Sequence, residues 1–239
     1  MKNYSPVKNL LAKGTTNAKL SKGDKYGWDS FILYLAPYNQ NSKGVNLCPN
    51  ASAGCAAACL FTAGRGRFSS VENARKNKTE YFLHDRQLFL AQLWNELAKI
   101  EKKAGNKCVR LNGTSDIDFP KLFLTHGFGD LCTSFPSIQF YDYTKSLYRI
   151  QKYSGTGYHL TFSRSESNDI ECDAALQMGA NVAIVFDQLP TTYKGVQVVN
   201  GDESDLRFLD PAGCIVGLKA KGKAKKGVNP FVVNHLETV

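Results

Sequence analysis

Seven short apolar runs, separated by segments of helical character, constrain the fold of this chain more than any other feature. The runs are rich in β-branched and aromatic residues, as buried strands are. They are FILYLAP (31–37), CVRLNG (108–113), IQFYDY (138–143), YHLTFS (158–163), NVAIVF (181–186), VQVVNG (196–201) and CIVGLK (214–219). Neighbouring parallel strands need a crossover connection, so strands that alternate with helices favour a parallel sheet. We therefore predict an α/β fold that forms a complete or partial (β/α) barrel.

The segments between these runs predict the helices. A long helix should start at Ser69 or Ser70, break near Asn77 and end at Gly105, and further helices are expected at 119–134, 144–152, 168–179 and, briefly, 203–209. Residues 1–30 are polar and Lys-rich, which predicts a loosely attached N-terminal arm. Residues 31–239 then form a single barrel-like domain.

Composition narrows the class of protein. With 43% hydrophobic residues the chain is not disordered, and it has no apolar run of the roughly 18 to 20 residues that a membrane helix needs. Its start lacks the apolar block of a secretory signal, so we expect a cytoplasmic protein. The formal net charge of +9 indicates an anionic partner, either nucleic acid or another phosphate-bearing anion.

Three cysteines follow the first predicted strand in LCPNASAGCAAACLF. In (β/α) barrels the loops after the strands form the functional face, so Cys48, Cys55 and Cys59 should lie at that face. Without an export signal, an odd set of 7 cysteines indicates metal ligands or buried thiols rather than disulfides.

The spacing of these cysteines leaves three alternatives. Structural zinc sites favour pairs of the C-x2-4-C type, which C-x6-C-x3-C does not match. Iron–sulfur clusters accept cysteines from loops of varied spacing, and small neighbouring residues let amides approach the sulfides. The leading hypothesis is an iron–sulfur cluster of the [4Fe-4S] type, with zinc or three free thiols as the alternatives. Cys172, in the first turn of a helix after a strand, is either a fourth ligand or a thiol packed beneath that helix.

The other cysteines have a structural interpretation. Cys108 and Cys214 begin strands, and Cys132 lies late in a helix, so all three are assigned to the opposite end of the barrel. We expect them to be inert, buried thiols.

Polar residues after several strands predict a ligand-binding collar around the cysteines. They are Asn112, Asp116, Asp142, Arg164, Glu166, Asp202, Arg207 and Lys219. Such side chains orient a charged ligand, or else form salt bridges and helix caps among themselves. Arg65 and Arg67 in GRGRF, and the lysines of KAKGKAKKG, either contact phosphates or form a solvated basic surface.

Two family resemblances bear on these hypotheses. The order of strand, cysteine loop and helix resembles radical S-adenosylmethionine enzymes, although their C-x3-C-x2-C spacing differs from that of Cys48, Cys55 and Cys59. The segments CPNASAGCAAAC, GRGRF, VRLNGTSDID, FSRSESN, GANVAIVF and VVNGDESDLRFLDPAGCIVGLKAKGKA are similar to bacteriophage proteins of the "gene product 88" type. That resemblance spans nearly the whole chain after residue 30. It implies a phage-encoded iron–sulfur protein and brings no reaction with it.

Three functions therefore stay open. The first is an iron–sulfur protein that acts on or with nucleic acid. The second is a radical or redox enzyme whose open cluster iron binds a small molecule such as S-adenosylmethionine. The third is a zinc-stabilised interaction module. The fourth cluster ligand separates the first two, because ligation by Cys172 would close every iron.

Overall fold

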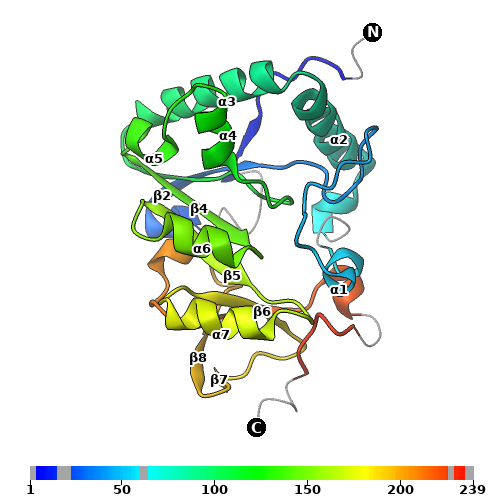
Figure 1. The fold of residues 1–239 in the computed structure, drawn as a ribbon, viewed down its shortest axis with the longest axis vertical. Helices are drawn as coiled ribbons and strands as arrows, with labels where there is room; N and C mark the ends of the chain where they lie inside the picture. The colour runs from blue at the N-terminus through cyan, green and yellow to red at the C-terminus, as the bar shows by residue number, and fades with distance from the viewer. Residues whose placement is uncertain (1–3, 15–22, 60–63, 226–228, 235–239) are drawn as a thin grey trace.

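The computed structural model describes residues 4–14, 23–59, 64–225 and 229–234, and it contains an open, nine-stranded sheet (Figure 1). The strand order is β1-β2-β3-β4-β5-β6-β9-β8-β7. The strands are β1 (Leu11–Lys13), β2 (Trp28–Leu33), β3 (Asn106–Arg110), β4 (Ile138–Thr144), β5 (Tyr158–Ser163), β6 (Val182–Phe186), β7 (Thr192–Tyr193), β8 (Val196–Asn200) and β9 (Ile215–Lys219). All neighbours pair in parallel except the two edge strands, β1 and β7, which pair antiparallel.

The α/β class and the parallel sheet are confirmed, whereas the complete barrel is wrong. Each of the seven predicted runs contains or overlaps one of the parallel strands. The sheet ends at β1 and β7 instead of closing, and β9 lies between β6 and β8. A two-residue turn at Lys194 and Gly195, both with positive φ (48° and 77°), joins β7 to β8 and so places a short hairpin at this edge.

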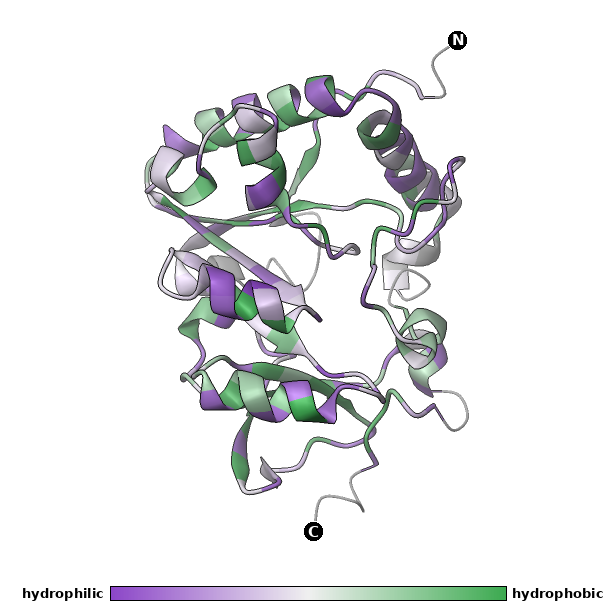
Figure 2. Ribbon diagram, viewed as in Figure 1, coloured by the Kyte–Doolittle hydropathy of each residue, from purple (hydrophilic) through white to green (hydrophobic). Residues whose placement is uncertain are grey.

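All the helices in the described ranges except the first pack on one face of the sheet. The α-helices are α1 (Ala53–Ala57), α2 (Ser69–His84), α3 (Arg86–Glu101), α4 (Phe119–Thr125), α5 (Leu131–Ser134), α6 (Leu147–Tyr153) and α7 (Asp169–Gln177). Side chains of α2 to α7 form the main core with alternate residues of the strands, among them Phe31, Val109 and Phe140. In Figure 2 the strand β6 is mainly hydrophobic, while parts of α2 and α6 are hydrophilic. No helix in the described ranges is long and apolar enough to span a membrane.

The opposite face of the sheet is covered by the chain between β8 and β9. The buried side chains of Cys108 and Tyr141 contact Leu206 there, and Phe208 packs edge-on to Tyr141 with 5.4 Å between ring centroids. The predicted short helix at 203–209 is a 3-10 turn over Arg207–Leu209 within this cover. The two faces of the sheet therefore have different roles, one holding the helical core and the other a polar-lined cover.

The first long helix breaks at a different place from the one expected. The chain bends at Asp85, between α2 and α3, instead of near Asn77. The side-chain amide of Asn77 accepts a hydrogen bond from the backbone N–H of Ser5 at 2.7 Å and donates one to its carbonyl at 2.9 Å. It therefore does not compete for the backbone hydrogen bonds of the helix. The segment 119–134 likewise divides into α4 and α5, because Gly127 and Gly129 between them adopt positive φ (79° and 101°).

The described part of the N-terminal arm is packed on the domain rather than loosely attached. The ring of Tyr4 stacks on Tyr81 with 4.7 Å between centroids. The side chain of Leu10 is fully buried, and the amides of Leu10 and Leu11 donate to the carboxylate of Glu96 at 2.8 and 2.9 Å. These contacts hold β1 against α3 as the first strand of the sheet.

Candidate functional site

The segment that carries the three cysteines leaves β2 and crosses the carboxyl ends of the parallel strands. The amide of Asp116, in the loop after β3, donates to the carbonyl of Leu47 at 2.9 Å. The sulfur of Cys48 lies 3.7 Å from the carbonyl oxygen of Thr114 in the same loop. Cys48 is therefore fixed beside the end of β3.

The short helix α1 places Cys55 beside the end of β5. The hydroxyl oxygen of Ser52 accepts from the amide of Cys55 at 3.1 Å and caps α1. The carboxylate of Glu166, after β5, accepts from the Ser52 hydroxyl at 2.6 Å and from the Gly54 amide at 2.7 Å. Burial alone would raise the pKa of Glu166, but these hydrogen bonds outweigh it and lower the pKa. Glu166 is thus an anchor for the cysteine segment.

The residue before Cys59 contacts the chain at the end of β9. The side chain of Ala58 is buried against Ala220 and Ala224, which lie just after β9. Cys59 itself is partly exposed. The cysteine segment, residues 47–59, is therefore attached to strands on both sides of the middle of the sheet.

The three thiols are close enough for their charges to affect one another. Burial raises the pKa of Cys48 to about 11, and the charges of Cys59 and Cys55 contribute. Burial also raises the pKa of Cys55, which the positive charge of Lys145 opposes. All the cysteines in the described ranges are free of disulfides. In the same ranges, no group of three or more His, Cys, Asp and Glu side chains is arranged to hold a metal ion.

Two cations beside the thiols were missed by sequence analysis. Lys145 follows β4 directly, and its ammonium donates to the hydroxyl of Ser163 at 2.7 Å. Burial lowers the pKa of Lys145, while the negative charge of Cys55 opposes that shift. Burial likewise lowers the pKa of Arg75, which the charges of Tyr34 and Cys59 oppose. The position of Lys145 directly after a strand was the only available signal, and Arg75 gave none because it lies inside α2.

Cys172 lies on α7, and its thiol, like that of Cys55, interacts with the charge of Lys145. Its side chain is buried, with the sulfur 3.7 Å from the side-chain oxygen of Asn168. Burial raises its pKa to about 12, and the charges that act on it most are those of Asp169, Arg164 and Asp173. This is the packed position beneath the helix that sequence analysis gave as the alternative to a fourth ligand, and ligation by Cys172 stays a prediction.

The remaining cysteines have buried or partly buried thiols. Cys108 and Cys214 are 0% and 3% exposed, and Cys132 on α5 is partly buried. Burial raises the pKa of Cys108 to about 12 and those of Cys132 and Cys214 to about 11. Burial of these three thiols is what we expect of structural cysteines.

Part of the predicted collar forms an internal network. Asp142 is fully buried and accepts from the backbone and side-chain amides of Asn112 at 2.8 and 2.9 Å and from the hydroxyl of Tyr158. Burial raises its pKa, and Arg110 opposes the shift. Asp116, also in the collar, pairs with Arg149. In these contacts Asn112, Asp142 and Asp116 hold the loop after β3 in place.

The other collar residues lie nearer the surface, with one exception. Arg164 pairs with Asp169 at 3.0 Å, and the carboxylate of Asp202 accepts from the amide of Lys219 at 3.0 Å. Arg207 is the exception, because it is 1% exposed in the cover over the second face of the sheet. A role for any of these side chains in ligand binding stays a prediction. Arg65 and Arg67 belong to a 3-10 turn, Gly64–Arg67, and their side chains lie outside the described part of the structure.

Together, fold and site define an open, mainly parallel α/β protein with a thiol-bearing segment across its strand ends. The family model described as gene product 88 matches residues 9–230, and the chain belongs to that family. This match confirms the resemblance to the phage gene-product type. No curated protein and no solved structure matches the chain.

Proposed function

We propose that this member of the gene product 88 family is an iron–sulfur protein whose cluster is bound by Cys48, Cys55 and Cys59. One observation carries the proposal. Three thiols from a single segment gather at the carboxyl ends of the parallel strands, close enough to raise one another's pKa. When bound, such a cluster supplies either electron transfer or an iron that binds a small molecule.

The chemistry of the surrounding residues supports a cluster with thiolate ligands. A cluster held by thiolates is anionic, and Lys145 and Arg75 place positive charge beside Cys55 and Cys59. Since Cys48 and Cys55 favour the protonated form, binding would release protons.

The position of Cys172 favours a cluster with one open iron. The side chain of Cys172 is 6% exposed and belongs to the main hydrophobic core, packed beneath α7. This observation supports, as a second candidate, a redox or radical enzyme that binds a small molecule such as S-adenosylmethionine at that iron. Lys145 would then offer an ammonium to an anionic group of the molecule.

A basic segment beside the cysteines supports a phosphate-bearing partner such as nucleic acid. Ala220 and Ala224 pack on Ala58, so the lysines around them lie next to the cysteine segment. These lysines are Lys219, Lys221, Lys223 and Lys225, and all four are exposed. In Figure 1 the segment runs beside α1. Phosphates bound there would make affinity depend steeply on salt. Location in the host cytoplasm is part of the same proposal.

The test is metal analysis of protein purified without oxygen. We expect iron and acid-labile sulfide together with visible absorption, and loss of both elements in Cys48→Ser, Cys55→Ser and Cys59→Ser. Cys132→Ser is the matched control, because Cys132 is also partly buried but lies on α5, and it should keep its iron. Cys172→Ser keeps its iron if the fourth position is open and loses iron if Cys172 is a ligand.

Two results would contradict the proposal. Protein that carries neither iron nor sulfide would remove the cluster altogether. Colourless protein that carries zinc through the same three cysteines would instead support the zinc-stabilised interaction module.

A further inference from the structure

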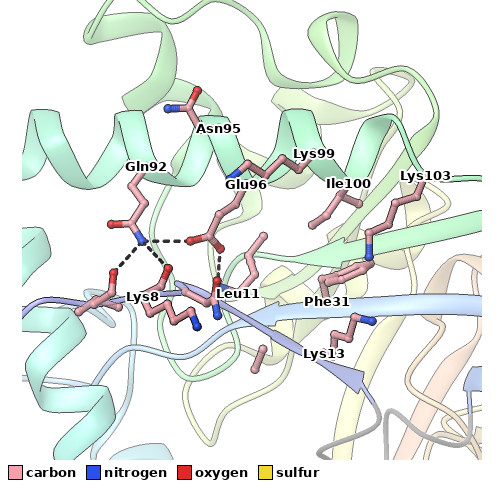
Figure 3. A pocket seen from close by; sticks show the side chains of 13 residues that line it. Lys8, Leu11, Lys13, Phe31, Gln92, Asn95, Glu96, Lys99, Ile100 and Lys103 are labelled. Atoms are coloured by element: carbon pink, nitrogen blue, oxygen red, sulfur yellow. Dashed lines mark hydrogen bonds between the residues drawn. The ribbon is translucent and has the colours of Figure 1, made fainter.

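A second basic surface lies at the β1 edge of the sheet. A groove of about 830 Å³ runs between the N-terminal segment and α3 (Figure 3). Lys8 and Lys13 line it from the N-terminal side, and Lys99 and Lys103 from α3 and the residues after it. The groove does not include the cysteine segment or the lysines after β9, so it is a separate surface.

The groove carries a net positive charge. Its four lysines face one carboxylate, Glu96, which leaves a formal excess of three positive charges (4 − 1 = 3). Glu96 is already used by neutral donors, since it accepts from the amides of Leu10 and Leu11 and from the side chain of Gln92 at 3.1 Å. The side chains of Lys8 and Lys99 are exposed, so an anionic partner can reach their ammonium groups.

The same contacts indicate which class of anion fits. An edge strand can bind an acidic peptide by strand addition, but Glu96 occupies the amides of Leu10 and Leu11 at this edge. Unpaired bases need aromatic faces for stacking. The only aromatic side chain lining the described groove is Phe31, which is buried and lies beneath the ammonium of Lys103 at 4.8 Å. In a duplex the bases are paired and need no stacking partner from the protein. Lysines that contact only phosphates therefore suit double-stranded nucleic acid.

We propose that the groove between β1 and α3 binds the phosphate backbone of double-stranded nucleic acid, without sequence preference, through Lys8, Lys13, Lys99 and Lys103. This binding is independent of the proposed iron–sulfur cluster. It would give the protein a duplex-binding surface at the far edge of the sheet.

The test compares duplex binding by the full-length protein and matched variants. Fluorescence anisotropy with a labelled duplex of about 20 base pairs, repeated at several salt concentrations, gives the slope of log K against log salt. Four phosphate contacts predict a slope of about −3.6. The double variant Lys8→Gln/Lys99→Gln should reduce that slope by about 2 and weaken binding about 30-fold near 0.15 M salt.

Two control variants remove the same amount of charge elsewhere. Lys223→Gln/Lys225→Gln tests the basic segment beside the cysteines, and Lys121→Gln/Lys152→Gln tests exposed positions on α4 and α6. The inference is supported if the groove variant alone loses affinity while its iron content stays that of the wild type. It is overturned if all three variants lose affinity equally, or if a single-stranded oligonucleotide binds more tightly than the duplex.

One further outcome separates this inference from the proposed function. If Lys223→Gln/Lys225→Gln loses affinity and the groove variant does not, the groove is overturned as the duplex site. The proposed phosphate-bearing partner of the cysteine segment would then stand. Loss of iron from the cysteine variants, with unchanged duplex affinity, would leave the groove in place.

Discussion

The contact between α1 and Glu166 predicts that Gly54→Ala destabilises the protein, although alanine normally stabilises a helix. A Cβ atom at Gly54 would lie 2.8 Å from one carboxylate oxygen of Glu166 and 2.9 Å from the other and from their carbon. Real Cβ contacts are essentially never below 3.0 Å. The carboxylate must therefore move away from the Gly54 amide and the Ser52 hydroxyl. It accepts hydrogen bonds from these two groups at 2.7 and 2.6 Å.

The size of the effect follows from these contacts. A hydrogen bond to a charged group contributes about 1.5 to 3 kcal/mol, and we expect the equivalent of one such bond to be lost. Alanine in place of glycine inside a helix stabilises the folded protein by about 0.5 to 1 kcal/mol. The free energy of unfolding of Gly54→Ala should then fall by about 0.5 to 2.5 kcal/mol. In a Glu166→Ala background no carboxylate is left to clash with the new Cβ atom. Gly54→Ala should then raise the free energy of unfolding by about 0.5 to 1 kcal/mol.

Urea unfolding of the four proteins in this double-mutant cycle measures the coupling between Gly54 and Glu166. Because α1 could detach without global unfolding, the rate at which Cys55 reacts with a thiol reagent is a second readout. We expect faster reaction in Gly54→Ala. An increase in stability from Gly54→Ala in both backgrounds, with unchanged reactivity of Cys55, would refute the reasoning.

Two further predictions concern buried titratable groups. Burial lowers the pKa of His159, and the charge of Arg207 lowers it further. The unfolded chain therefore binds a proton near pH 6.5 that the folded protein does not, and stability falls as the pH drops from there through the lowered folded pKa. In urea titrations at pH 7.5 and 5, His159→Phe should lose this part of the pH dependence. Asp142→Asn should lower stability by about 1 to 3 kcal/mol in thermal or urea unfolding, because an amide nitrogen in place of Oδ2 cannot accept from the Asn112 side chain and the Tyr158 hydroxyl.

Each of these predictions has a matched comparison. His126 lies at the end of α4 and is partly exposed, so His126→Phe is the control for replacing a histidine by phenylalanine outside the position of His159. Asp130 caps α5 by accepting from the amide of Thr133 at 2.8 Å. Asparagine caps a helix about as well, so Asp130→Asn should change stability by less than about 0.5 kcal/mol. Equal losses from Asp130→Asn and Asp142→Asn would contradict the assignment of Asp142 as a buried network centre.

The candidate site was only partly predictable from sequence. The cysteines could be placed after the first core strand, because chain order fixes which residues follow a strand. The role of Glu166 as an anchor could not be foreseen, since the Gly54 amide it accepts from is 112 positions away in the chain. Lys145 and Arg75 were missed for the same reason: they approach the thiols only through the packing of β4 and α2 against the cysteine segment.

The sequence by itself determined the seven inner strands, the α/β class and the placement of three thiols after β2, because apolar β-branched runs must be buried and their order is local information. Only the tertiary structure decided that the sheet stays open, that β9 inserts between β6 and β8, and that β1 folds back to form a basic groove with α3. These outcomes depend on contacts between residues far apart in the chain, such as the hydrogen bonds from Leu10 and Leu11 to Glu96. No local pattern of residues encodes such contacts, because they exist only once the helices have packed on the sheet.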